Sequence, residues 1–117
     1  MLPGGDSVTD CLFCKIVAKE IPSTPVGETD RIYAFRDIAP SSPTHVLLIP
    51  KEHLADSVAE AGPDDGLWLA ELFGLAARIA EDEGLEAGWR LVTNVGAAAG
   101  QTVFHVHFHL MGGWTDR

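Results

Sequence analysis

The chain has 117 residues and a formal net charge of −9 at pH 7, with 17 acidic residues against 8 lysines and arginines. This length fits one domain, and a hydrophobic fraction of 46% is enough to fill a single core. The acidic balance excludes a nucleic-acid surface that tracks phosphates, because such surfaces need clustered Lys and Arg. No apolar run approaches the roughly 18 residues that a membrane span needs.

The N-terminal segment MLPGGDSVTD predicts a loose tail over residues 1–10, followed by one domain over residues 11–117. It has no basic start and no apolar stretch, so we expect no secretory signal and a cytoplasmic protein. Residues 12–20 place Phe13, Ile16 and Val17 at helical spacing. This short helix should stop before Ile21-Pro22, because proline disfavours helical backbone in the residue before it.

Three strands are predicted next, over residues 25–29 and 31–37, with a turn at Asp30, and in the run HVLLIPKEH of residues 45–53, where Pro50 ends the strand. Two more strands, over residues 89–95 and 102–111, are joined by the small-residue loop GAAAGQ. Because most of these strands follow one another through short connections, the sheet should be antiparallel. We therefore predict an α+β domain with a five-stranded antiparallel sheet, one long helix and one short helix.

The long helix is predicted over residues 64–84, with Asp64 and Asp65 as its cap. Its apolar stripe consists of Leu69, Leu72, Phe73, Ala76, Ile79 and Ala80. Trp68 and Leu75 lie off that stripe. Either a second subunit covers this flank, or the two residues are ordinary exposed apolar side chains.

Two cysteines, Cys11 and Cys14, stand in the motif CLFC. In a reducing compartment such a pair favours a metal or redox element over a structural disulfide. A zinc site needs four ligands, so this interpretation requires two more ligands elsewhere.

Three histidines alternate with apolar residues in FHVHFHLM: His105, His107 and His109. On a strand they point to one side, about 6–7 Å apart, and the core side takes Phe104, Val106, Phe108 and Leu110. A single histidine in a sheet is usually structural. Three in register leave two interpretations open: ligands of a shared metal, or a neutral imidazole nucleophile with its helpers. The N–H groups of the preceding loop, with the Thr102 hydroxyl, could hold phosphate oxygens.

The segment GQTVFHVHFHLMGGW resembles the signature of the histidine triad family, His-φ-His-φ-His-φ-φ with φ apolar. The segments CLFCKIVAKEIPS and YAFRDIAPSSPTHVLLIPKEH, and the segment around Asn94, also resemble the family in order and spacing. The resemblance covers most of residues 11–113. It is closest to the nucleoside phosphoramidate hydrolases and their bacterial relatives, and it implies a homodimer with a ten-stranded sheet that binds purine mononucleotides.

This resemblance implies that His107 attacks the α-phosphorus, giving a nucleotidyl-histidine that water then hydrolyses. A backbone carbonyl of a neighbouring strand should hold the His107 tautomer. The resemblance also places His109 and His45 in the phosphate pocket as imidazolium donors, together with Thr102. The remaining nucleotide-binding residues that it implies are Asn94, Gly100 and Gln101 near the phosphate, Asp37 at the ribose, and Phe13, Ile16, Phe35, Ile38 and Leu47 around the base.

Some relatives hold zinc between a CxxC pair and two histidines, which correspond here to Cys11, Cys14, His53 and His105. Zinc would then be structural, and no cofactor would be required for the chemistry. The alternative is two reduced thiols in the core. Three other functions stay open: a non-catalytic zinc- and nucleotide-binding module, a dinucleoside polyphosphate hydrolase, or a metallohydrolase with zinc on the histidine row.

Overall fold

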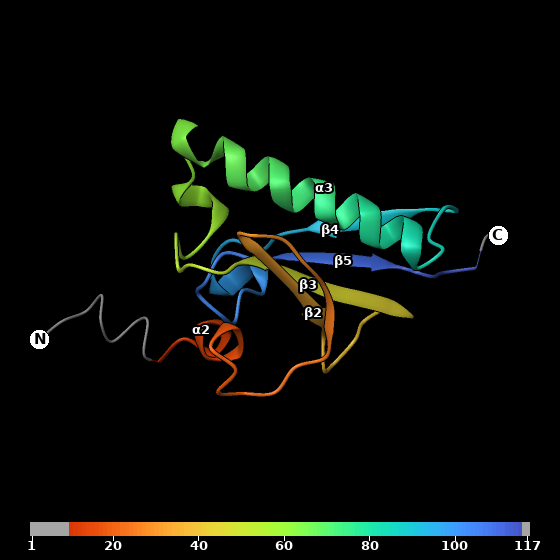
Figure 1. The fold of residues 1–117 in the computed structure, drawn as a ribbon, viewed down its shortest axis with the longest axis horizontal. Coiled ribbons are helices and arrows are strands. Elements are labelled where there is room, and N and C mark those ends of the chain that lie inside the picture. The colour runs from red at the N-terminus through yellow and green to blue at the C-terminus, as the bar shows by residue number, and fades with distance from the viewer. Residues whose placement is uncertain (1–9, 116–117) are drawn as a thin grey trace, which may run out of the picture.

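The computed structural model describes residues 10–115, so the predicted tail lies outside the described residues apart from Asp10. Figure 1 shows the arrangement of the chain. The strands are β1 (Pro25–Glu28), β2 (Ile32–Arg36), β3 (Thr44–Pro50), β4 (Trp89–Val92) and β5 (Phe108–Gly112). The helices are α2 (Leu12–Val17), α3 (Gly66–Asp82) and the short 3-10 helices η1 (Val58–Glu60), η2 (Pro63–Asp65) and η3 (Ala97–Ala99). Within residues 10–115, no helix has the length and apolar character to cross a membrane.

The five strands form one antiparallel sheet in the order β1-β2-β3-β5-β4, which confirms the predicted fold class. α3 lies across one face of this sheet and α2 lies against the other (Figure 1). Both faces of the central strand are therefore covered, and β3 is buried along almost its whole length. This double cover explains why residues 46–50 of β3, VLLIP, form an apolar run without a polar residue.

The helix α3 packs with a different phase from the predicted one. Trp68 and Leu75 are buried on the sheet side, whereas Phe73 is 46% exposed. Leu72, Ala76, Ile79 and Ala80 are buried as predicted, but the buried side of α3 is rotated toward Trp68 and Leu75. The flank that was considered for a second subunit is therefore covered by the chain's own sheet. Asp65 is the N-cap residue of α3, as predicted, but its carboxylate accepts hydrogen bonds from the Gly62 N–H and the Trp68 indole and makes no capping hydrogen bond to α3.

The strand β5 starts at Phe108, six residues later than predicted. The ladder with β3 ends at the pair Leu48 and Phe108, because Pro50 has no N–H to donate and its carbonyl accepts from the His105 ring. His105 and His107 therefore precede the strand. Phe104, predicted on the core face, is 46% exposed.

Candidate active site and metal centre

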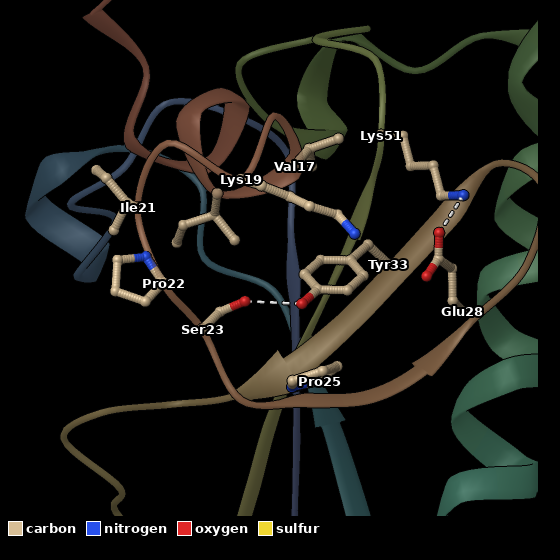
Figure 2. A pocket seen from close by; sticks show the side chains of 10 residues that line it. Val17, Lys19, Ile21, Pro22, Ser23, Pro25, Glu28, Tyr33 and Lys51 are labelled. Carbon is tan, nitrogen blue, oxygen red and sulfur yellow. Dashed lines mark hydrogen bonds and ion pairs between the residues drawn. The ribbon is translucent and has the colours of Figure 1, made fainter.

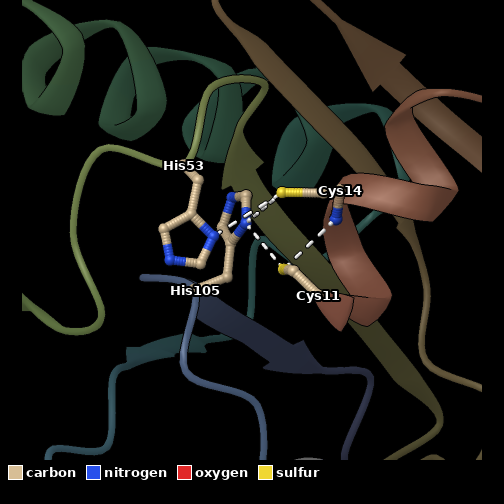
Figure 3. Close-up of side chains that lie close together, drawn as sticks. All are labelled: Cys11, Cys14, His53 and His105. Carbon is tan, nitrogen blue, oxygen red and sulfur yellow. Dashed lines mark hydrogen bonds between the residues drawn. The ribbon is translucent and has the colours of Figure 1, made fainter. Parts of the chain in front are cut away.

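Four side chains from three separate segments converge at one end of the sheet (Figure 3). Cys11 and Cys14 come from the start of α2, His53 follows β3, and His105 precedes β5. The Cys11 Sγ lies 3.3 Å from the His105 Nδ1, and the Cys14 Sγ lies 3.5 Å from the His53 Nδ1 and 3.6 Å from the His105 Nδ1. All four ligand atoms lie within 4.8 Å of one another, so the residues that the resemblance implied for zinc are brought together.

These separations fit a tetrahedral metal ion. Zinc bonds of about 2.3 Å to sulfur and about 2.0–2.1 Å to nitrogen at tetrahedral angles place a sulfur and a nitrogen about 3.5 Å apart. The three S–N distances of 3.3, 3.5 and 3.6 Å bracket that value. The donor set is therefore consistent with zinc in a closed structural site.

The second nitrogens of both histidine rings have partners outside the cluster. The Nε2 of His105 donates to the Pro50 carbonyl at 2.8 Å, and the Nε2 of His53 lies 3.2 Å from the Asp56 carboxylate. Both partners fix the rings with Nδ1 facing the two thiols, which is the outer-shell arrangement usual for metal-bound histidine. Asp56 was not predicted as a site residue, and the only indication in the sequence is its position three residues after His53.

The His107 ring is held in one tautomer by its own segment. Its Nδ1 lies 2.7 Å from the carbonyl of His105, so this nitrogen carries the proton and Nε2 keeps its lone pair. The prediction of a backbone carbonyl was right in kind, but the carbonyl lies two residues earlier and not in a neighbouring strand. The His107 carbonyl in turn accepts from the Thr93 hydroxyl at 2.7 Å.

A second hydrogen-bonded chain orients His109. The Ser41 N–H donates to the His45 Nδ1 at 2.9 Å, so the His45 proton lies on Nε2. That Nε2 is 2.9 Å from the His109 Nδ1 and 3.4 Å from an oxygen of Asp37. The His109 Nδ1 is consequently an acceptor, and its Nε2 carries a proton that it can donate.

Burial lowers the pKa of two histidines that line the candidate site, His107 and His109. Burial, followed by the neighbouring His107 and His45, lowers the pKa of His109 to about 4, although Asp37 opposes the shift. Burial also lowers the pKa of His107. A pKa of about 4 favours a neutral His109 at neutral pH, whereas the resemblance implied an imidazolium. A lowered pKa at His107 favours a free lone pair on its Nε2.

A cavity of about 290 Å³ lies between α2 and the sheet. The register places Phe35, Leu47 and His109 in one row across β2, β3 and β5, which forms its floor. Phe13 closes one side, with its ring 5.7 Å from that of Phe35 and 4.9 Å from that of His107. The predicted residues that line this cavity are Phe13, Ile16, Phe35, Asp37, Ile38, Leu47, Thr102, His107 and His109.

Three predicted nucleotide-binding residues do not line this cavity: Asn94, Gly100 and Gln101. The Gln101 side chain is buried, accepts from the Gly96 N–H, and donates to the carbonyls of Asp56 and Val103. The N–H groups of Gly100 and Gln101 donate to carbonyls inside the same loop. Several donors of this loop are therefore used within the loop itself. The cavity is also lined by four apolar residues that were not predicted from the sequence: Leu12, Ile21, Pro22 and Val103.

Comparisons with family models, curated proteins and solved structures all point to one family. The model of the HIT domain matches residues 18–116. Protein HitA of Neisseria gonorrhoeae is 45% identical over 103 residues, covering 88% of this chain and 95% of that protein. The purine nucleoside phosphoramidase of Escherichia coli is 43% identical over 105 residues, covering 89% and 87%. A HIT family hydrolase from Clostridium thermocellum has a TM-score of 0.86 and 49% identity, covering 90% of this chain and 91% of that one.

Proposed function

The chain belongs to the HIT domain family, and on that premise we propose that it hydrolyses purine nucleoside phosphoramidates, or related nucleotide conjugates, at the α-phosphorus. The observation that carries this proposal is the fixed His107 tautomer, with Nδ1 held by the His105 carbonyl and Nε2 free on a residue that lines the cavity. The Escherichia coli relative named as a purine nucleoside phosphoramidase supports the substrate class.

In the proposed first step, the His107 Nε2 forms a bond to phosphorus while the bond from phosphorus to the leaving nitrogen breaks. The leaving amine keeps that electron pair and takes one proton from solvent. In the second step, water adds to phosphorus and Nε2 leaves with the electrons of the P–N bond. Water returns one proton to solvent, so the net reaction consumes one water and yields a nucleoside monophosphate and an amine.

The neutral His109 would stabilise this reaction by donating its Nε2–H to a phosphoryl oxygen, and the Thr102 hydroxyl would add a second donor. Asp37 would accept hydrogen bonds from the ribose hydroxyls. The apolar cavity with its aromatic residues Phe13 and Phe35 suits a flat purine base.

Zinc fits the donors Cys11, Cys14, His53 and His105. When bound, it would tie α2 to the end of β3 and to the segment before β5. None of the proposed steps uses it, because the His107 Nε2 belongs to a ring outside this set. A second possible ligand set, Asp37, His45 and His109, has its ligand atoms within 4.8 Å of one another and includes one residue of the histidine row. A metallohydrolase would lose turnover on chelation, whereas the proposed reaction would keep it.

The family resemblance also implies a homodimer, and two features of the chain support it. β4 pairs only with β5 within the described residues, so its other edge is available to a second copy. The apolar side chains of Trp89 on β4 and Phe73 on α3 are 42% and 46% exposed. We expect a dimer mass in sedimentation at micromolar concentration; a monomer mass would contradict this part of the proposal.

The function is tested by mixing the protein with adenosine 5′-phosphoramidate and measuring AMP release and the intact protein mass. We expect turnover and a transient nucleotidyl adduct that the His107→Ala variant does not form, with its kcat at least about a thousandfold lower. Tight AMP binding without turnover would favour the non-catalytic module. Faster turnover of a dinucleoside polyphosphate would favour the alternative hydrolase.

A further inference from the structure

A second, larger cavity lies beside the cavity of about 290 Å³ described above, on the same face of the sheet. Its volume is about 450 Å³, within the usual range of small-molecule sites. The two cavities share the wall residues Ile16, Ile21 and Pro22. Tyr33 lines the second cavity and Phe35 the first, and their rings stack with centroids 5.4 Å apart. An aromatic floor thus continues from one cavity into the other.

The polar wall of this cavity carries a net positive charge in a strongly acidic protein. Figure 2 shows the Lys19 and Lys51 ammonium groups and the Glu28 carboxylate around it. Two positive charges and one negative charge give a net charge of +1, whereas the whole chain carries −9. The Glu28 Oε2 lies 2.6 Å from the Lys51 Nζ, and this hydrogen bond, with a smaller contribution from Lys19, lowers the pKa of Glu28.

Lys19 occupies a backbone position where glycine is the usual residue. Its φ is +65°, and no other non-glycine residue among residues 10–115 has a positive φ. The Glu20 N–H donates to the Lys15 carbonyl and the Lys19 N–H to the Ile16 carbonyl, which is the Schellman pattern at a helix end. A lysine there costs about 1–2 kcal/mol relative to glycine in this conformation. The strain therefore points to a use for its side chain.

Two hydroxyl groups also line this cavity, those of Ser23 and Tyr33. The Ser23 Oγ and the Tyr33 Oη are 2.7 Å apart, and they share one hydrogen bond (Figure 2). Two hydroxyls have two protons, so one proton remains to be donated to a ligand. A carboxylate has two oxygens, and this hydroxyl and the Lys19 ammonium would supply a donor for each.

We propose that this cavity is a second binding site, which takes an organic monocarboxylate with a compact apolar body. The single net positive charge matches a monoanion better than a phosphate dianion. Ile16, Val17, Ile21 and Pro22 give the apolar body a surface to contact, and the Tyr33 ring gives it a floor. The Glu28 carboxylate pairs with the Lys51 ammonium and would compete with the ligand for it.

The experiment uses 3-phenylpropionate as the probe and 3-phenylpropan-1-ol as its neutral counterpart. Tyr33 is the only tyrosine in the chain, so selective ¹³C labelling of tyrosine gives an NMR signal located in this cavity. We expect a saturable shift of the Tyr33 signals with the acid, and at least about tenfold weaker binding of the alcohol. An excess of AMP should leave the shift intact. Equal binding of the alcohol, no saturable shift, or displacement by AMP would overturn the assignment.

Variants separate this site from general electrostatics and from folding. Lys19→Gly relieves the backbone strain, so its thermal midpoint should not fall, yet it should bind the acid at least about tenfold more weakly. Lys19→Arg should restore binding to within about threefold. Arg78→Gln removes a charge from exposed α3 and should change nothing. Glu28→Gln should tighten binding. Unweakened binding by Lys19→Gly, an equal loss in Arg78→Gln, or no gain in Glu28→Gln would each contradict the proposal.

Discussion

Replacing His105 by glutamine should reduce the loss of folding stability that the metal-free protein undergoes between pH 7 and pH 4.5. Burial lowers the pKa of the His105 imidazole from 6.5 to about 4, and this side chain is fully buried. Since the folded-state pKa lies below the unfolded value, the unfolded chain binds more protons between these two pH values. The contribution of His105 to stability is thus complete above pH 6.5, and it is lost as the pH falls toward 4.

The size of this contribution follows from the two pKa values. A difference of about 2.5 pH units, at about 1.4 kcal/mol each, amounts to about 3 kcal/mol. Between pH 7 and pH 4.5, where titration is incomplete, about 2 kcal/mol should be lost. No reduction for solvent screening is needed, because the ring is not exposed.

The assay is urea unfolding of protein treated with a chelator, followed by tryptophan fluorescence at pH 7 and at pH 4.5. His105→Gln should unfold more easily than the unchanged chain at pH 7, and the difference between the two should shrink by about 2 kcal/mol at pH 4.5. Other titrating groups, His109 included, are common to both proteins and cancel. If the two free energies of unfolding fell in parallel with pH, the reasoning from burial would be refuted. When zinc is added back, the unchanged chain should lose its stability only at lower pH, since a metal on the His105 Nδ1 would prevent protonation of that nitrogen.

Three further changes test other parts of the structure. Asp56→Asn leaves the His53 Nε2 facing an amide, so zinc affinity measured by competition with a chelator should fall about 10–100-fold while AMP affinity is unchanged; an unaltered zinc affinity would remove Asp56 from the outer shell. Asp37→Ala should raise KM for adenosine phosphoramidate and reduce the preference for ribose over 2′-deoxyribose in steady-state kinetics; a ribose preference equal to that of the unchanged chain would exclude the proposed ribose contact. Gly112→Ala would place a methyl group 2.9 Å from the Leu85 Cδ1, so urea unfolding should show a loss of stability of about 1–3 kcal/mol. The same change should cost much less in a chain that already carries Leu85→Ala, because the smaller side chain leaves room for the methyl group. An equal cost in both backgrounds would contradict this steric cause.

The sequence predicted the order of elements well because hydrophobic periodicity and proline positions are local signals. It placed the phase of α3 incorrectly, because apolar residues lie on more than one side of this helix. Trp68, Leu72 and Phe73 are all apolar, and only contact with the sheet decides which of them is buried. The period alone does not make that choice.

The histidine segment shows the same limit at the site. Alternation correctly predicted that Val106 and Phe108 join the core on the α3 side. It did not predict that the ladder stops at Phe108, because this depends on Pro50 of β3, which has no N–H to donate and whose carbonyl accepts from the His105 ring. The hydrogen-bond partners of His107 and His45 likewise depend on three-dimensional geometry, and no sequence pattern specifies the Ser41 N–H as a donor.

His105 takes part in the two halves of the site through different atoms. Its ring belongs to the cysteine cluster, whereas its main-chain oxygen holds the His107 ring, the proposed nucleophile. Every amino acid carries that oxygen, so a descendant protein can exchange the ring for another side chain without altering the partner of His107. If the proposed function holds, metal binding and catalysis would be separable traits, and selection could discard the first while it preserves the second.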